Sequence, residues 1–403
     1  MRLALLSVIC SFGTCMFSQP ETHKVSMDVK TEKEIGTGAS QFNKYFSALQ
    51  NKRVAFVGNH TSIVNRRHLL DSLLSLKVNV IKVFFPEHGF RGDEDAGATV
   101  KNYKDKKTGL PCISLYGKEN KKPRKEDLTG IDVVLFDIQD VGARFYTYIS
   151  TLHYVMEACA EQKIKLIVLD RPNPNGYYVD GPVLEESCKS FVGMHPVPIV
   201  HGMTIGEYAR MINGEGWLSD KIQCELEVIP VSGYEHSDYF ELNVKPSPNL
   251  PNAASVYLYP SLCLFEGTIV SVGRGTDLPF QQFGYPGMTS NGYSFKPEPK
   301  PGASKDPVYN GKKCDGFNVS FYGEMFMKHY KQLYLYWIIN TYKNAKDKQK
   351  FFNDYFKSLA GTTKLRKQIE EGMSEKDIRL SWNDDLVKFK AVRKKYLLYK
   401  DFE

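Results

Sequence analysis

The side chains best suited to chemistry are concentrated between positions 137 and 148, directly after the apolar run 132–136. Two carboxylates, an amide, a guanidinium and two phenols lie in this stretch: Asp137, Gln139, Asp140, Arg144, Tyr146 and Tyr148. An apolar run bounded by polar residues is typical of a strand buried on both faces. Ligands of open α/β sheets bind beyond the carboxyl ends of such strands, which is where these groups fall. The alternative is that Asp137 or Asp140 only caps the next helix, although a cap needs neither an arginine nor phenols.

Three further predicted strands, 53–58, 78–85 and 165–169, also end in polar loops. Those loops carry, in order, Asn59 and His60, Glu87 and His88, and Asp170 and Arg171. Because the carboxyl ends of parallel strands meet at one edge of a sheet, we expect all four loops to lie together there.

Helical periodicity alternates with these strands over residues 66–76, 148–163 and 204–213. Thr204 and Glu207 have the spacing of a capping box at the start of the third helix. Short strands are also predicted at 112–115 and 224–231. Strands that alternate with helices indicate βαβ units, so the sequence predicts an α/β fold with a mostly parallel sheet and flanking helices.

The character of the sequence changes near residue 245, because the run 246–252 is too rich in proline for a helix or a central strand. We therefore predict one domain over 45–250 and a smaller one over 251–403, preceded by a flexible lead-in over 20–44. In the second domain we expect a strand at 317–321, a helix over 324–343, and two or three helices between 350 and 395.

The first residues have the pattern of a signal peptide, which we assign to 1–19. Arg2 precedes about a dozen apolar residues, and polar sequence begins near Ser18. The apolar run is too short to span a membrane, and no other stretch is long and apolar enough to do so. We expect export to the periplasm or the medium as a soluble protein, with a lipoprotein anchored at Cys15 as the weaker alternative.

Composition and motifs exclude several classes of function. The net charge of +7 is modest for 403 residues, and no basic tract is interleaved with aromatics, which argues against a nucleic-acid partner. No glycine-rich nucleotide loop and no GxSxG elbow occur, so no nucleotide cofactor is expected. The six cysteines after the leader form no CxxC, and Cys112 and Cys159 fall in apolar patterns typical of a core. A divalent ion held by His60, His88 and the nearby aspartates is an alternative without a specific spacing.

Glycoside hydrolysis fits the polar groups better. It needs one protonated carboxyl group near the leaving oxygen and a second group that stabilises or attacks the sugar cation. The candidate carboxyl groups are Glu87, Asp137, Asp140 and Glu266. The arginines that could pair with a substrate carboxylate are Arg91, Arg144, Arg171 and Arg274, although a structural salt bridge is an equal alternative for each. Tyr146, Tyr148 and Tyr285 could stack on sugar faces.

Long motifs along the chain resemble one known family, the exo-β-N-acetylmuramidases of the NamZ (YbbC-like) type. They cover residues 86–92, 136–148, 169–174, 201–204, 248–249, 265–268 and 273–276, in the order of the family. The resemblance extends over nearly everything after the leader. It implies a Rossmann-like N-terminal domain and a C-terminal domain that closes the cleft. It also implies release of terminal N-acetylmuramic acid from the non-reducing ends of peptidoglycan fragments, and it brings Asn173, His201 and Asn249 into the expected site.

The expected substrate assigns roles to these residues. We expect Glu87 to be the general acid/base, and either Asp137 or Asp140 to orient the 2-acetamido group or stabilise the cation; the sequence does not choose between them. We expect an arginine to bind the lactyl carboxylate of muramic acid. Arg91 and Arg144 are the first candidates for this role, and Arg171 and Arg274 come next. The rival functions are a non-catalytic binder of cell-wall fragments and a metal-dependent hydrolase.

Overall fold

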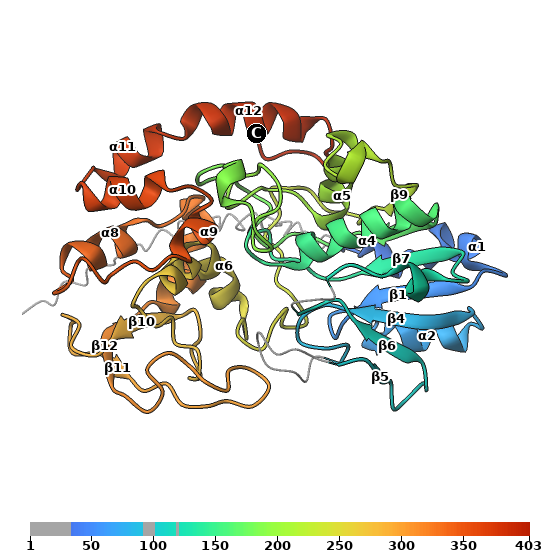
Figure 1. The fold of residues 1–403 in the computed structure, drawn as a ribbon, viewed down its shortest axis with the longest axis horizontal. Coiled ribbons are helices and arrows are strands. Elements are labelled where there is room, and N and C mark those ends of the chain that lie inside the picture. Colours follow the sequence, from blue (N-terminus) through green and yellow to red (C-terminus); the bar gives the residue numbers. More distant parts are fainter. Residues whose placement is uncertain (1–33, 92–100, 118–120) are drawn as a thin grey trace, which may run out of the picture. The chain divides into compact units, whose positions relative to one another are not determined.

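The computed structural model describes residues 34–91, 101–117 and 121–403, and residues 35–403 form one compact unit. Its frame is a seven-stranded sheet in the order β5-β6-β4-β1-β7-β8-β9 (Figure 1). The strands are β1 (Val54–Gly58), β4 (Val80–Phe85), β5 (Tyr103–Lys104), β6 (Pro111–Ser114), β7 (Val133–Asp137), β8 (Lys165–Leu169) and β9 (Leu226–Ile229). β5 pairs antiparallel with β6, and every other pair of neighbours is parallel. The predicted α/β fold with a mostly parallel sheet is confirmed.

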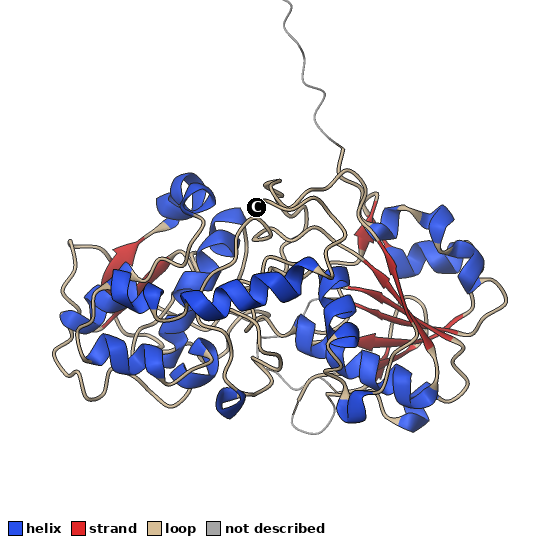
Figure 2. Cartoon of the chain, turned by 90° about the horizontal axis from the view of Figure 1, so that it is seen from above, coloured by secondary structure: helices blue, strands red, loops and turns tan. Residues whose placement is uncertain are grey.

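The sheet is buried on both faces because the side chains of its strands alternate between two apolar cores. In β7, Val134 and Phe136 belong to one core, and Val133 and Leu135 belong to the other. The first core is completed by α4 (Tyr148–Gln162) and α5 (Ile205–Gly214), and the second by α1 (Phe46–Leu49) and α2 (Leu69–Ser75). Figure 2 shows helices on both sides of the strands. This two-sided burial explains why the strands are continuous apolar runs.

The order of the strands reverses at β1. After β1 the chain adds β4 and β6 on one side of it, and then returns to add β7, β8 and β9 on the other. The short helix α3 (Lys125–Leu128) lies in the connection that makes this return. The switch point of the sheet therefore lies between β1 and β7, where the loops leaving the two carboxyl ends diverge and open a crevice.

The predicted capping box of α5 is present. Thr204 Oγ1 accepts a hydrogen bond from the Glu207 amide at 3.3 Å, and Glu207 Oε2 accepts one from the Thr204 amide at 2.9 Å. The helix predicted over 66–76 begins later, because β2 (Ile63–Val64) and β3 (Arg67–His68) form a hairpin first. Asn65 and Arg66 make its two-residue turn, with φ of 48° and 63°, as a tight hairpin turn requires.

The C-terminal part contains a three-stranded antiparallel sheet, in the order β10-β12-β11, and most of the remaining helices. Its strands are β10 (Gln282–Tyr285), β11 (Ser294–Phe295) and β12 (Cys314–Asn318), and its helices are α6 (Ala253–Leu262), α7 (Met327–Tyr330), α8 (Tyr336–Lys343), α9 (Phe356–Ala360), α10 (Lys364–Glu370), α11 (Glu375–Leu380) and α12 (Asn383–Lys394). The single helix predicted over 324–343 is wrong: α7 ends at Tyr330, because the next residue, Lys331, has a φ of 54°. The helix α6 was not predicted.

Residues 35–44, which the sequence assigns to a flexible lead-in, belong to the compact unit. The Gly38 amide donates a hydrogen bond to the Asp170 carbonyl oxygen at 2.8 Å, and Gly36 forms a bridge with Ser232. A Cβ at Gly38 would lie 2.3 Å from the Ile229 carbonyl oxygen, so only glycine fits there. The rest of the predicted lead-in, residues 20–33, and the predicted leader lie outside the described residues.

Two smaller expectations concern the core and the membrane. Cys112 and Cys159 are buried, as predicted, and both thiols are free. Within the ranges that the structure describes, no helix combines the length and the apolarity that a bilayer span requires.

Candidate active site

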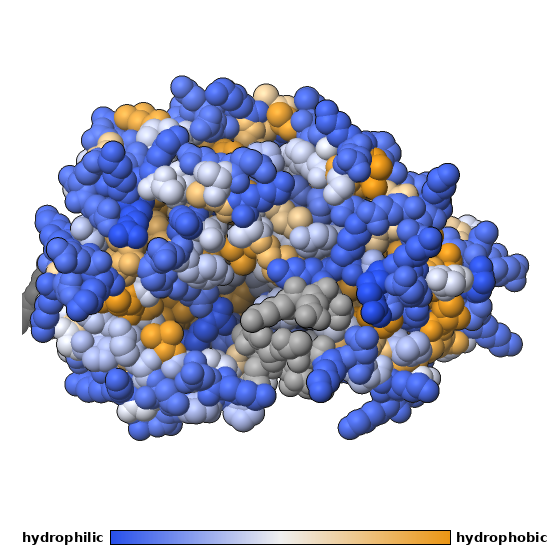
Figure 3. Space-filling view, viewed as in Figure 1, coloured by the Kyte–Doolittle hydropathy of each residue, from blue (hydrophilic) through white to orange (hydrophobic). Residues whose placement is uncertain are grey.

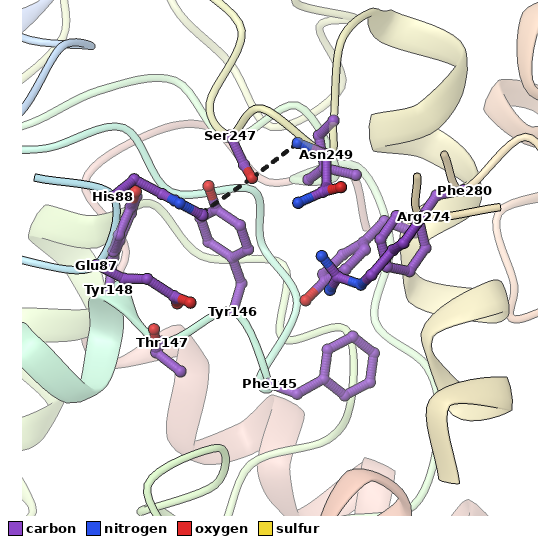
Figure 4. A pocket seen from close by; sticks show the side chains of 12 residues that line it. Glu87, His88, Phe145, Tyr146, Thr147, Tyr148, Ser247, Asn249, Arg274 and Phe280 are labelled. Atoms are coloured by element: carbon purple, nitrogen blue, oxygen red, sulfur yellow. Dashed lines mark hydrogen bonds between the residues drawn. The ribbon is translucent and has the colours of Figure 1, made fainter. Parts of the chain in front are cut away.

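A pocket with an empty volume of about 420 Å³, open to solvent, lies where four separate parts of the chain meet (Figure 4). The loop after β4 contributes Glu87 and His88, and the loop between β7 and α4, together with the first residue of α4, contributes residues 145–148. Ser247, Asn249 and Leu250 come from the proline-rich run, and the C-terminal part adds Tyr259, Arg274 and Phe280. Residues from both predicted domains therefore form a single concave site.

Glu87 reaches this pocket because the backbone turns sharply after β4. His88 has a φ of 72° and Gly89 a φ of 77°, and such a conformation is uncommon for a residue with a side chain. The buried His88 ring lies 3.2 Å from Ser247, measured between Nε2 and Oγ. The turn thus directs the imidazole toward the proline-rich run, while the Glu87 carboxylate points into the pocket (Figure 4).

Tyrosines form a rigid wall beside Glu87. The Tyr146 hydroxyl donates a hydrogen bond to the Pro246 carbonyl oxygen at 2.8 Å, and the Tyr148 hydroxyl accepts one from Asn59 Nδ2 at 3.0 Å. The two rings meet edge to face, with centroids 4.8 Å apart. Burial, and then the nearby Glu87 carboxylate, raise the pKa of Tyr148 above its ordinary value. The wall is therefore neutral and suited to packing against a sugar ring.

Arg274 faces Glu87 from the opposite side of the pocket (Figure 4). Its Nε lies 2.5 Å from Glu266 Oε1, its Nη2 lies 3.2 Å from Glu266 Oε2, and its guanidinium stacks over Phe280 at 4.9 Å. Burial by itself would lower the pKa of Arg274, but the Glu266 carboxylate outweighs burial and raises it. Arg274 is therefore a fixed positive charge at the pocket, held by Glu266 from behind.

Asp137 does not line the pocket. It is fully buried at the end of β7, and it accepts two hydrogen bonds from Arg171, at 2.6 Å from Nε and 2.9 Å from Nη2. Neither Asp137 nor Arg171 lines this pocket, because the carboxylate and the guanidinium form a bidentate pair with each other.

Asp140 is also buried away from the pocket. Its Oδ2 accepts a hydrogen bond from the Gly142 amide at 2.6 Å, and its Oδ1 has no hydrogen-bond partner in the described part of the chain. Burial raises the pKa of this carboxyl group to about 7. Asp140 is therefore a buried carboxyl group near Tyr146 and Tyr148 that does not line the pocket.

The two arginines expected first as substrate readers are engaged elsewhere. Arg144 is fully buried and donates hydrogen bonds to the carbonyl oxygens of Pro182, Val197 and Leu359, at 2.7 to 3.0 Å. Arg91 pairs with Asp105, its Nη2 lying 2.9 Å from Oδ2. Of the four candidate arginines, Arg274 is the one that lines the pocket.

Other predicted site residues support the loops around the pocket. Asp170 accepts hydrogen bonds from the Thr204 hydroxyl and the Gly206 amide, at 2.7 and 2.8 Å, and so anchors α5. Asn173 Nδ2 donates to the Met203 carbonyl oxygen at 2.9 Å.

Two histidines expected in the site also contact protein backbone. His201 accepts a hydrogen bond from the Met203 amide at 3.3 Å, and burial lowers its pKa to about 3. His60 Nε2 donates to the Lys245 carbonyl oxygen at 2.9 Å. Of Asn173, His201 and Asn249, the three residues that the resemblance added, Asn249 lines the pocket. Its Nδ2 donates a hydrogen bond to the Ala303 carbonyl oxygen at 2.9 Å.

The structure brings together six of the predicted residues in one pocket: Glu87, His88, Tyr146, Tyr148, Asn249 and Arg274. It adds six lining residues that the sequence analysis did not select: Phe145, Thr147, Ser247, Leu250, Tyr259 and Phe280. Phe145 and Thr147 belong to the motif 136–148, whereas no motif in the sequence marks Tyr259 or Phe280 as a site residue. In the described ranges, no group of three or more His, Cys, Asp or Glu side chains is placed to hold a metal ion.

Comparisons with known proteins agree on one family. The family model described as exo-β-N-acetylmuramidase NamZ, N-terminal, matches residues 54–254, and the C-terminal model of that family matches residues 257–399. The chain is 36% identical to the peptidoglycan β-N-acetylmuramidase NamZ of Bacillus subtilis, over 98% of this chain and 99% of that protein.

Two crystal structures of DUF1343 family proteins from Bacteroides fragilis are also similar. One is 46% identical with a TM-score of 0.84, and covers 91% of this chain and 99% of its own. The other is 30% identical with a TM-score of 0.74, and covers 91% of this chain and 100% of its own.

Proposed function

Because the chain belongs to the exo-β-N-acetylmuramidase NamZ family, we propose that it releases terminal N-acetylmuramic acid from the non-reducing ends of peptidoglycan fragments. The observation that carries this proposal is the pair formed by Glu87 and Arg274, which face each other across one pocket with a tyrosine wall (Figure 4). A carboxyl group can protonate a leaving oxygen, and a fixed guanidinium can bind a carboxylate. N-acetylmuramic acid offers both a glycosidic oxygen and a lactyl carboxylate.

Glu87 is our candidate for the general acid/base. In the described part of the chain, it is the one carboxylate among the residues that line the pocket. It would donate a proton to the glycosidic oxygen as the bond from that oxygen to C1 breaks, and later accept a proton from the water that attacks C1.

The absence of Asp137 and Asp140 from the lining favours a second group that belongs to the substrate. The 2-acetamido oxygen would form a bond to C1 as the leaving group departs, and water would then open this cyclic intermediate. Two successive displacements at C1 return the sugar with retained configuration. Proton NMR of the first product formed measures this directly, and an inverted product would exclude the acetamido as nucleophile.

Arg274 is our candidate for the residue that binds the lactyl carboxylate. Its side chain is 28% exposed, so it meets a ligand while it remains bound to Glu266. The Tyr146 and Tyr148 rings offer an apolar surface for the sugar.

Turnover of a chromogenic N-acetylmuramide by the purified protein, with and without chelator, tests the proposal against its rivals. A metal-free glycosidase keeps its activity in chelator, a metal-dependent hydrolase loses it, and a non-catalytic binder is silent in both conditions. Release of N-acetylmuramic acid from the interior of long glycan strands would contradict the exo mode of action.

A further inference from the structure

A second and larger cavity opens at the switch point of the sheet. Its empty volume is about 1180 Å³, open to solvent, and its lining includes Thr61 after β1, Gln139 after β7 and Arg171 after β8. Ligands of open α/β sheets bind at this position. The cavity lies close to the first pocket, since Asn59 donates a hydrogen bond to Tyr148 and accepts one from Thr61 Oγ1.

In the described part of the chain, the lining of this second cavity contains guanidinium groups and no carboxylate. The guanidinium groups are those of Arg66 and Arg171. Arg171 donates hydrogen bonds to Asp137 from Nε and Nη2, and its Nη1 has no hydrogen-bond partner among the described residues. Because only 6% of Arg171 is exposed and two of its nitrogens are bonded to Asp137, its guanidinium is fixed in position at the cavity.

Gln139 contributes a fixed acceptor. Its Nε2 donates hydrogen bonds to the carbonyl oxygens of Asp140 and Pro172, at 2.8 and 2.7 Å. These two bonds fix the orientation of the amide, and its Oε1 takes no partner in the part of the chain that the structure describes. Gln139 is 4% exposed and lines the cavity, so this oxygen is suited to accept a hydrogen bond from a ligand hydroxyl.

Arg66 is presented by the hairpin turn between β2 and β3, where the backbone of Asn65 and Arg66 is left-handed. Its neighbour Arg67 belongs to the same hairpin but does not line the cavity, and its Nη2 donates to the Asp71 carbonyl oxygen at 3.0 Å. The lining also has an apolar part, which includes Phe240 and Leu242.

We propose that the second cavity binds a small hydroxylated carboxylate, such as a free sugar acid. Arg66 and Arg171 Nη1 bind the carboxylate, Gln139 Oε1 accepts a hydrogen bond from a hydroxyl, and the apolar wall packs against ring carbons. Binding here needs no hydrolysis and uses none of the residues of the first pocket. Free N-acetylmuramic acid, the product under the proposed function, has the required chemistry and is the probe of choice.

Calorimetric titration of free N-acetylmuramic acid into the full chain tests the proposal. Two variants change the lining: Arg66→Met removes a positive charge, and Asn243→Asp adds a negative one. Arg67→Met is the matched control. We expect a binding event that Arg66→Met and Asn243→Asp each weaken at least tenfold and that Arg67→Met leaves intact. N-acetylglucosamine, which lacks the carboxylate, should not produce this event.

Equal binding by wild type, Arg66→Met and Asn243→Asp would overturn the second site. An equal loss in Arg67→Met would also overturn it, because the effect would then be one of general surface charge. The test is separate from the proposed function: a chain that shows the Arg66-dependent event but does not cleave an N-acetylmuramide keeps the second site and loses the proposed hydrolysis.

Discussion

Arg171 holds the carboxylate of Asp137 in a buried bidentate pair, with Nε 2.6 Å from Oδ1 and Nη2 2.9 Å from Oδ2. Each of these residues alone has the chemistry of a site residue. Paired, they fix each other's position and support the loops after β7 and β8. Glu87 and Arg274 line the pocket instead, and they are therefore our candidates for the acid/base and for the arginine that binds the substrate.

Glu87→Gln should abolish most of the activity while the protein stays folded. The amide keeps the shape of the side chain but lacks the acidic proton, so we expect kcat to fall by roughly two to four decades. The measurement is the rate of N-acetylmuramide cleavage, with Glu186→Gln, a change at a largely exposed glutamate, as the control. Near-normal turnover by a folded Glu87→Gln protein would exclude Glu87 as the acid/base.

Arg274→Met should reduce selectivity for the lactyl group. Loss of the partner of a desolvated carboxylate typically costs about 2–5 kcal/mol, or several tens to thousands of fold. We expect kcat/KM for the N-acetylmuramide to fall by that factor, while any slow turnover of the corresponding N-acetylglucosaminide stays the same. Arg53→Met, which removes only a surface partner of Asp132, is the control. Unchanged selectivity in Arg274→Met would assign the preference to the apolar wall instead.

Asp140→Asn should stabilise the protein more at pH 8 than at pH 4. An unfolded aspartate titrates near 3.8, whereas burial raises the pKa of Asp140 in the folded protein to about 7. Between these values the folded state binds more protons, so this group makes wild type less stable as the pH rises. Asparagine does not ionise, and its side-chain oxygen can still accept from Gly142.

Chemical unfolding at several pH values measures the difference between the two proteins. The gain in the free energy of unfolding should widen from about pH 4 to about pH 7 and then stay constant. A gain that is independent of pH would show that Asp140 ionises normally in the folded state.

Arg144→Met should destabilise the fold, because it leaves buried carbonyl oxygens of Pro182, Val197 and Leu359 without a donor. Each unsatisfied buried group costs about 1–3 kcal/mol, so we expect a loss of about 3 kcal/mol or more in the free energy of unfolding. Arg366→Met, at an exposed pair with Glu370, should change it by less than about 1 kcal/mol. A loss of activity in Arg144→Met without a loss of stability would instead indicate that Arg144 binds the substrate.

Export remains a proposal, and it is based on the sequence of residues 1–19. We expect the mature protein to begin after the apolar run and to fractionate with soluble periplasmic or secreted material. N-terminal sequencing of the protein from its native cells checks this, and a mature chain that began at Met1 would refute it.

Local patterns were sufficient to predict the parallel strands β1, β4, β6, β7, β8 and β9, the helices α4 and α5, and the loop that carries Glu87. These features follow from short-range rules, since apolar runs and capping residues act over a few positions. The burial of β7 on both faces could be predicted from the sequence because no polar residue interrupts the run from Val133 to Phe136. By contrast, the interruption at Lys331 depends on one left-handed residue that no periodicity marks.

Only the tertiary structure decided which polar groups face a ligand. Arg144 and Arg274 are the same residue type in similar loops, yet Arg144 is enclosed by three carbonyl oxygens and Arg274 is held at the pocket by Glu266. The partners of Arg144 come from distant positions, such as Leu359, and a sequence does not record such long-range pairings. The sequence therefore determined the family, the fold and the candidate residues. Packing determined which of these residues line the pocket, because a buried charge must be paired with a group that the fold places beside it.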